Sequence, residues 1–400
     1  MTETFEVGAR PRPYLLPRLR VAGDLLQYEA CPLRYRMHGV GAWPEADAED
    51  APRLAGTLVH AALDHAGTAC RPTAAGGQGL PINEVAASRA VESGQRLVDA
   101  ISPRAIRSDA LQGALDVAAT LARCTVLNLG PHLFPFLAAT EQRIAATRRH
   151  VIDLHVEGGG YRRLRKVERF EVSGVLDALA TGLVPDPDGD PFAALIHGAF
   201  KQPGVGPIDA VIDYKLARRP HASVVGSRGV ASGRSDLEAH AFQAAAYACI
   251  RDRFAAGRPH VGIVIYLRDL FPELDSRRDG QSGLGLAAGR GAISDAELRA
   301  MGDAMSVAAR LHRASTVVEL DDDVIAEATA RIDRIGAAIE ACAEHEAASV
   351  PPRLAWPTRR SALCGECDVR PMCPEWQDTG ESVGRNMARM GYAQGEPDEG

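Results

Sequence analysis

Hydrophobic positions in the middle of the chain form short or alternating runs, and elsewhere they recur at helical spacing. Three of the short runs predict β-strands, at 141–147, 170–179 and 210–214. A fourth, wholly apolar strand is predicted over 261–267, after an alanine-rich helix at 237–251. Another helix begins at Gly56, before the first strand. The pattern therefore predicts the order helix, three strands, helix, strand, in an α/β fold.

Apolar residues three and four positions apart predict further helices outside this order. Two long ones, at 83–101 and 104–129, lie between the first helix and the first strand and are expected to form an inserted helical lobe. A capping box at Ser294 predicts a helix that ends near residue 312, and the last long helix is expected over 322–346. The stretch 185–207 is rich in Gly, Pro and Asp and is expected to be a long connection between the second and third strands.

The composition is that of a soluble globular protein, with 46% hydrophobic and 24% charged residues. The apolar runs are shorter than the roughly 18 residues that span a bilayer, and the N-terminus shows no apolar signal segment. A cytoplasmic protein with no membrane contact is expected. The net charge of −7 argues against a protein that coats DNA non-specifically, but it permits a local basic channel.

Lysine is rare in this chain, because only Lys166, Lys201 and Lys215 occur among 45 basic residues. None of them follows a glycine, so the chain has no P-loop for a nucleotide. A lysine that persists among so many arginines indicates chemistry for which arginine is unsuited, since an ammonium is a compact charge with a tunable pKa.

Lys215 ends a predicted strand, in the triplet Asp213-Tyr214-Lys215. Strand alternation places Asp213 and Lys215 on the same face. Asp177, in the motif Gly-Val-Leu-Asp, lies on the preceding predicted strand, so two neighbouring strands can offer carboxylates to one divalent cation. An Asp-X-Lys triplet alone is more often a solvated ion pair. The second aspartate and the scarcity of lysine favour a metal site.

The eight cysteines fall into two groups, and neither is expected to form disulfides in a cytosolic chain. Small buried hydrophobic residues are expected at Cys70, Cys124, Cys249 and Cys342. A metal-binding loop is expected at Cys364, Cys367 and Cys373, which lie within ten residues. The best fourth ligand is Cys31, because it precedes a proline, as Cys373 does. Four thiolates suit either Zn²⁺ or an iron–sulfur cluster.

Several motifs together resemble the PD-(D/E)XK nuclease superfamily in its RecB-like branch. They are His60 in Gly-Thr-Leu-Val-His, Asp177 in Gly-Val-Leu-Asp, the triplet ending at Lys215, and Gln243-Ala-Ala-Ala-Tyr247. One upstream cysteine and a downstream Cys-X2-Cys-X5-Cys are similar to the arrangement of the iron–sulfur nucleases AddB and the CRISPR-associated RecB-like exonucleases. The resemblance runs from Tyr28 to Pro374 and implies a [4Fe-4S] cluster that acts as a structural staple of the chain ends.

The resemblance also implies a role for each motif residue. Mg²⁺ or Mn²⁺ would be held by His60, Asp177, Asp213 and the Tyr214 carbonyl. Lys215 would position or activate the attacking water. Gln243 and Tyr247, one helical turn apart, would face the site and the nucleic acid, although an alanine-rich helix also commonly carries such residues without a function. Glu141 is either a further acidic ligand or a strand-end charge, and a histidine such as His60 is often a core residue.

Arginines close to the two catalytic strands are candidates for contact with DNA. Arg218 and Arg219 begin a polar loop over 218–236 that is expected to act as a lid. A second basic run precedes the second strand and consists of Arg162, Arg163, Arg165 and Lys166. Basic runs usually lie on faces exposed to solvent without a function. Because these runs are close in sequence to both catalytic strands, DNA contact and a solvated surface have equal weight.

Five segments are expected along the chain. They are an N-terminal segment with the first cluster cysteine (1–55), a restriction-endonuclease-like core (56–270) with a helical insertion at about 83–130, a helical region (271–350), a cysteine loop (351–376) and a disordered tail (377–400). The expected function is a metal-dependent deoxyribonuclease, an exonuclease rather than an endonuclease, that acts on single-stranded DNA or DNA ends in repair, recombination or antiviral defence. A separate helicase or defence-system protein is a candidate partner. The alternative is a catalytically silent iron–sulfur subunit that binds nucleic acid within a helicase–nuclease complex.

Overall fold

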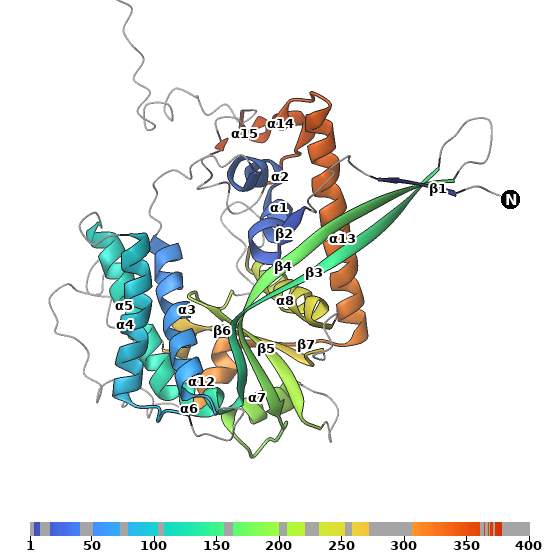
Figure 1. The fold of residues 1–400 in the computed structure, drawn as a ribbon. Helices are drawn as coiled ribbons and strands as arrows, with labels where there is room; N and C mark the ends of the chain where they lie inside the picture. The colour runs from blue at the N-terminus through green and yellow to red at the C-terminus, as the bar shows by residue number, and fades with distance from the viewer. Residues whose placement is uncertain are drawn as a thin grey trace, which may run out of the picture.

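One twisted sheet forms the centre of the computed structural model (Figure 1). Its central strands follow the predicted order, as β3 (Leu137–His155), β4 (Arg163–Leu183), β5 (Ile208–Lys215) and β6 (Val261–Tyr266). β3, β4 and β5 are antiparallel neighbours, whereas β6 is parallel to β5. The crossover that a parallel pair requires contains helix α8 (Ser232–Asp252). The predicted mixed α/β arrangement is confirmed.

The structure describes residues 4–8, 17–40, 51–72, 79–102, 108–155, 163–199, 206–220, 232–252, 258–271, 306–360, 364, 367, 369–370 and 373–377. Several predicted features lie outside the described residues, namely most of the expected lid (221–231), the capping box at Ser294 and the tail from residue 378.

The sheet contains strands that the hydrophobic pattern did not predict. β7 (Ser315–Glu319) pairs antiparallel with β6, and β1 (Thr4–Gly8) and β2 (Arg18–Arg20) pair parallel with β4. Each has at most five residues, too few for alternation to be distinguished from chance. Helix α7 (Pro191–Ala199) likewise lies inside the stretch expected to be a connection.

β3 and β4 are much longer than the runs that predicted them. Beyond the core they continue as a two-stranded arm that extends away from the rest of the fold (Figure 1). β1 pairs with β4 toward the far end of this arm, at the register Thr4–Arg163. β3 and β4 follow each other along the chain, so closing the loop between them costs little conformational entropy.

The two long helices predicted between the first helix and the first strand are present beside the sheet. Helix α3 (Ala51–Cys70) begins five residues before the expected Gly56, and α4 (Glu84–Ile101) and α5 (Asp109–Asn128) pack against it. The Asn83 side chain caps α4 and the Ser108 side chain caps α5.

α5 is the one helix among the described residues that is long and apolar enough to cross a membrane by length and composition. Half of its apolar window is buried inside the protein, as in the core helix of a soluble domain. The helix therefore gives only weak evidence for a membrane span.

A second layer lies on the α8 side of the sheet. α13 (Asp322–Ala347) packs on α8, and ion pairs with α13 are formed by Glu29 of the short helix α1 (Leu26–Ala30) and by Arg36, which directly follows α2 (Pro32–Tyr35). Arg331 pairs with Glu29 at 2.5 Å and Arg36 with Glu346 at 2.5 Å. The N-terminal segment is thus bound to the C-terminal half of the chain.

Candidate active site

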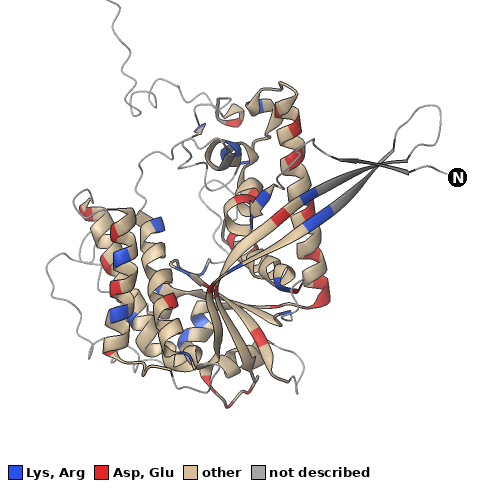
Figure 2. Ribbon diagram, viewed as in Figure 1, with Lys and Arg blue, Asp and Glu red and all other residues tan. Residues whose placement is uncertain are grey.

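The strand register brings three carboxylates into one row across the sheet. Antiparallel pairing of β4 with β5 sets Asp177 opposite Asp213, one step beyond the pair Ala178–Ile212. The pairing of β3 with β4 brings Glu141 opposite Asp177 on the other side. Acidic positions meet at this part of the sheet, beside α3 (Figure 2). The two aspartates are 36 positions apart in sequence, and this separation includes the end of β4, α7 and the first part of β5.

His60 from α3 completes a cluster at one end of this row. Its Nδ1 lies 3.3 Å from Asp177 Oδ1 and 3.4 Å from Glu141 Oε1. Ligand atoms of the three residues all lie within 4.8 Å of one another, which is the only such group of possible metal ligands among the described residues. The second oxygen of Asp177 accepts a hydrogen bond from the Tyr214 amide at 2.7 Å, and this bond holds the carboxylate in place.

Asp213, Lys215 and Gln243 form a hydrogen-bonded unit at the other end of the row. Lys215 Nζ donates to Asp213 Oδ1 at 3.1 Å and to Gln243 Oε1 at 3.0 Å. Gln243 Nε2 donates to Asp213 Oδ1 and to the Tyr247 hydroxyl, both at 3.0 Å. The sequence-predicted residues of β5 and α8 are therefore brought together, and the lysine ammonium is fixed by two partners.

Gly174 explains how Tyr247 reaches this unit. A Cβ atom at Gly174 would lie 2.3 Å from a ring carbon of Tyr247, so the ring packs directly on the backbone of β4. The glycine of the motif Gly-Val-Leu-Asp thus makes room for the tyrosine of the helix motif, and the two sequence signals have one structural cause.

Burial and neighbouring charges shift the pKa values within the cluster. Burial raises the pKa of Asp177, whose side chain is 10% exposed; repulsion from Asp213 adds to this, and His60 and Lys215 oppose it. Burial disfavours the charged form of His60, but Asp177 and Glu141 together raise its pKa to about 10. The imidazole is therefore protonated on both nitrogens and positively charged in the metal-free protein. A cation that binds at Nδ1 must displace the proton on that nitrogen.

The donor set fits a hard divalent cation. Carboxylate oxygens from neighbouring strands and one imidazole are ligands that Mg²⁺ or Mn²⁺ accepts. Asp213 Oδ2 is buried and lies 2.8 Å from Lys215 Nζ, yet it forms no hydrogen bond of acceptable geometry. An oxygen left in this state is available as a ligand.

Glu141 and the residue before it show features that the sequence did not reveal. Glu141 has a φ of 44°, in the left-handed region that residues other than glycine rarely adopt. The adjacent Thr140 is tied to α3, because its hydroxyl donates to Asp64 Oδ1 at 2.5 Å and lies 2.9 Å from Thr68 Oγ1. Asp64 is one turn from His60, so this contact anchors the strained strand residue beside its histidine partner.

The structure describes the candidate DNA-binding arginines less completely than it describes the carboxylate row. Arg218 is exposed, whereas Arg219 is half-buried, with its amide bound to Asp269 at 2.5 Å and its Nη1 3.5 Å from the Arg313 carbonyl oxygen. The basic run falls on the arm, where Arg162 lies outside the described residues and Arg163, Arg165 and Lys166 are described only as strand backbone.

The two groups of cysteines differ in burial, as expected. The four single cysteines are buried, whereas Cys31, Cys364, Cys367 and Cys373 are half-buried. Cys31 and Cys367 both pack against the core that contains Trp356. The four candidate sulfurs do not form a group at the spacing of ligands to a single ion.

A carboxylate row beside a fixed lysine on a mixed α/β sheet could hold a divalent cation next to an ammonium group. Residues 22–190 match the model of the PD-(D/E)XK nuclease superfamily, and the chain contains a domain of this superfamily over those residues. The sheet and its helices are consistent with a restriction-endonuclease-like fold. No curated protein matches the chain. The matched range includes His60, Glu141 and Asp177, and the β4–β5 pairing joins Asp213 and Lys215 to it.

Proposed function

We propose that the protein is a Mg²⁺- or Mn²⁺-dependent deoxyribonuclease that cleaves single-stranded DNA, preferentially from an end. The observation that carries this proposal is the fixed contact of Lys215 with Asp213, directly across the sheet from Asp177. A structural ion pair would not require the neighbouring cluster of His60, Glu141 and Asp177, whose ligand atoms lie within 4.8 Å of one another.

Each side chain has a task in phosphodiester hydrolysis. The cation would be held by His60, Glu141, Asp177, Asp213 and the Tyr214 carbonyl. When bound, Mg²⁺ or Mn²⁺ supplies Lewis-acid polarisation of the phosphoryl oxygen and lowers the pKa of a coordinated water. Lys215 orients that water and stabilises the negative charge that develops on the phosphate. Gln243 holds the ammonium in place and is itself held by Tyr247.

Metal-dependent cleavage tests the proposal directly. We expect the purified protein to degrade end-labelled linear single-stranded DNA with Mg²⁺ or Mn²⁺ and to be inactive in EDTA. Circular single-stranded DNA should persist if ends are required. Asp177→Asn, prepared in parallel, serves as the control for contaminating nucleases. Tight DNA binding without cleavage of either substrate would instead favour the catalytically silent subunit of a helicase–nuclease complex.

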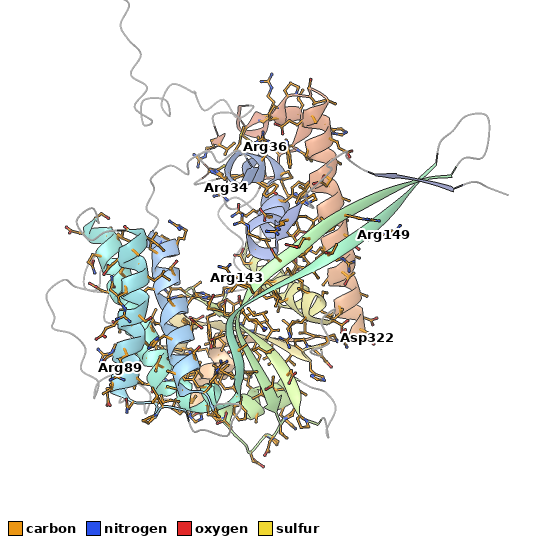
Figure 3. The ribbon with its side chains drawn as sticks, in the orientation of Figure 1. Arg34, Arg36, Arg89, Arg143, Arg149 and Asp322 are labelled. Atoms are coloured by element: carbon orange, nitrogen blue, oxygen red, sulfur yellow. The ribbon has the colours of Figure 1, made fainter. Side chains whose placement is uncertain are left out.

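Exposed arginines beside the site support a path for the DNA strand. Arg143, two residues past Glu141 on β3, is exposed on the part of the sheet between α3 and α1 (Figure 3). Arg218 lies three residues past Lys215, within about 10 Å even if the chain is extended. Both can contact phosphates that flank the scissile one, and such contacts position DNA without reading its sequence.

The double change Arg218→Ala with Arg219→Ala is expected to weaken single-stranded DNA binding and leave turnover at saturating DNA largely intact. These arginines bind substrate and transition state alike, so their loss lowers affinity rather than kcat. The slope of log affinity against log salt should flatten by up to about 1.4, at about 0.7 per charge lost. Arg89→Ala, an exposed arginine on α4, should change neither value. An unchanged salt slope in the double variant would move the DNA path to the basic run on the arm.

We further propose that Cys31, Cys364, Cys367 and Cys373 bind a [4Fe-4S] cluster that joins the chain ends. Arg359 Nη1 donates to the carbonyl of Glu29 at 2.5 Å, and Glu29 lies in α1, the helix that directly precedes Cys31. Four thiolates on one zinc must lie within about 3.8 Å of one another, given Zn–S bonds near 2.3 Å in a tetrahedron. A cubane spreads its four ligands over four irons, so its sulfurs need not approach one another as closely.

A further inference from the structure

His240 lies on the face of α8 that carries the catalytic network, although no sequence motif indicated it. It precedes Gln243 by three residues and Tyr247 by seven, which places all three side chains on one helix face. Gln243 contacts both Asp213 and Lys215. His240 is therefore one helical turn farther along the site, on the side away from Tyr247.

The partner of His240 comes from the strand next to Lys215. His240 Nδ1 lies 2.9 Å from the Tyr266 hydroxyl oxygen, and the ring centroids are 5.7 Å apart. Tyr266 ends β6, where the parallel register sets it opposite Lys215. The row across the sheet, which begins with Glu141, thus ends beyond the lysine in a histidine–tyrosine pair.

The pair leaves one imidazole nitrogen available. Tyr266 is fully buried and burial raises its pKa to about 12, so its hydroxyl is protonated and can donate to Nδ1. Burial, together with Lys215, lowers the pKa of His240 to about 4, so the ring is neutral; when Nδ1 accepts from Tyr266, the one proton of the ring is on Nε2. Among the described residues, Nε2 of this half-buried ring has no hydrogen-bond partner.

We propose that His240 Nε2 donates a hydrogen bond to a phosphate oxygen of the bound strand, on the Lys215 side of the scissile phosphate. Tyr266 is the positioning residue that holds the ring in the required tautomer. The proposal rests on the proposed function. It adds an uncharged phosphate contact to a site whose other contacts are a cation and arginines, and a nucleic-acid phosphate is the ligand that this chemistry fits.

Two amide substitutions distinguish this role from a structural one. His240→Gln can place an N–H near the position of Nε2, whereas His240→Asn can place a polar atom only near Nδ1, toward Tyr266. We expect His240→Ala and His240→Asn to weaken binding of a fluorescent single-stranded oligonucleotide by about tenfold or more, as for a lost hydrogen bond to a charged group. His240→Gln should recover most of that loss.

Salt dependence supplies the second readout, measured by anisotropy in EDTA so that no cleavage occurs. Because the imidazole is neutral, its contact with a phosphate does not contribute to counterion release on binding. The salt slope of His240→Ala should therefore equal that of the wild type. This separates His240 from Arg218 and Arg219. Tyr266→Phe should give an intermediate affinity with the same slope.

The outcomes separate failure of this inference from failure of the proposed function. Recovery by His240→Asn but not by His240→Gln, or wild-type affinity in His240→Ala, would assign the residue to packing with Tyr266 and overturn the inference alone. A salt slope reduced by about 0.7 in His240→Ala would overturn the neutral contact. A wild-type protein that neither binds nor cleaves DNA would overturn both.

Discussion

Replacing Lys215 with methionine is expected to slow DNA cleavage by about 10²- to 10³-fold while the protein still folds and binds its metal. Methionine keeps an unbranched side chain of similar length, and the site is partly open because the Lys215 side chain is 23% exposed. What is lost is the ammonium that Asp213 and Gln243 hold in place. Removing one preorganised electrostatic group costs about 10²- to 10³-fold in kcat.

The measurement is a single-turnover rate at saturating DNA, with thermal unfolding as the check on folding. Asp213→Asn gives the matched comparison, because it removes a charge from the metal site. Part of its loss should be recovered at higher Mg²⁺ or Mn²⁺, whereas Lys215→Met should gain nothing from additional metal. Lys215→Arg should remain impaired, since a planar guanidinium cannot occupy the place of a compact ammonium. A wild-type rate in Lys215→Met would remove the lysine from the mechanism.

The core elements could be predicted because their burial leaves a pattern in the sequence. β6 is buried at every position and stands out as an apolar run, and α4 and α5 show helical spacing and side-chain caps. The outer parts of β3 and β4 could not be predicted, because each strand of the arm is paired mainly with its sequence neighbour. In the stretch from Arg163 to Glu168, charged residues predominate and leave only a weak apolar signal.

The candidate site likewise has features that could be predicted from the sequence and features that could not. The proximity of Asp177, Asp213 and Lys215 could be predicted, because strand alternation and the order of the strands need no tertiary information. The placement of Glu141 depends on the β3–β4 register and on a backbone conformation that no propensity indicates. His240 depends on a residue from β6, and that contact follows from a parallel register set by a long crossover. His240, whose neighbour depends on this register, is thus the residue that sequence reasoning misses, whereas for Glu141 it leaves two interpretations open.

The contact between the chain ends is the basis of the second large effect. Trp356 packs edge-on against Tyr28, with ring centroids 6.3 Å apart, and donates from Nε1 to Glu346 at 2.7 Å. Arg370 then organises the cysteine loop, because its Nε donates to the Cys364 carbonyl at 2.7 Å. The protein surface around the proposed cluster is therefore formed by both ends of the chain.

Cys31→Ser is expected to remove the visible absorbance of an iron–sulfur cluster and to leave a poorly soluble protein. A cluster bound by Cys31 and Cys364 closes a loop of about 330 residues, and in the chain-entropy treatment of a covalent cross-link a loop of this size contributes roughly 5–6 kcal/mol. Iron, sulfide and zinc contents of anaerobically purified protein, together with the urea midpoint, provide the measurement. Cys70→Ala, at a buried cysteine of α3, should keep both colour and metal content. Stoichiometric zinc without iron or sulfide in the wild type would replace the cluster with a zinc site. A colourless protein with neither metal would show that the ion pairs of α13 with α1 and α2 suffice to join the ends.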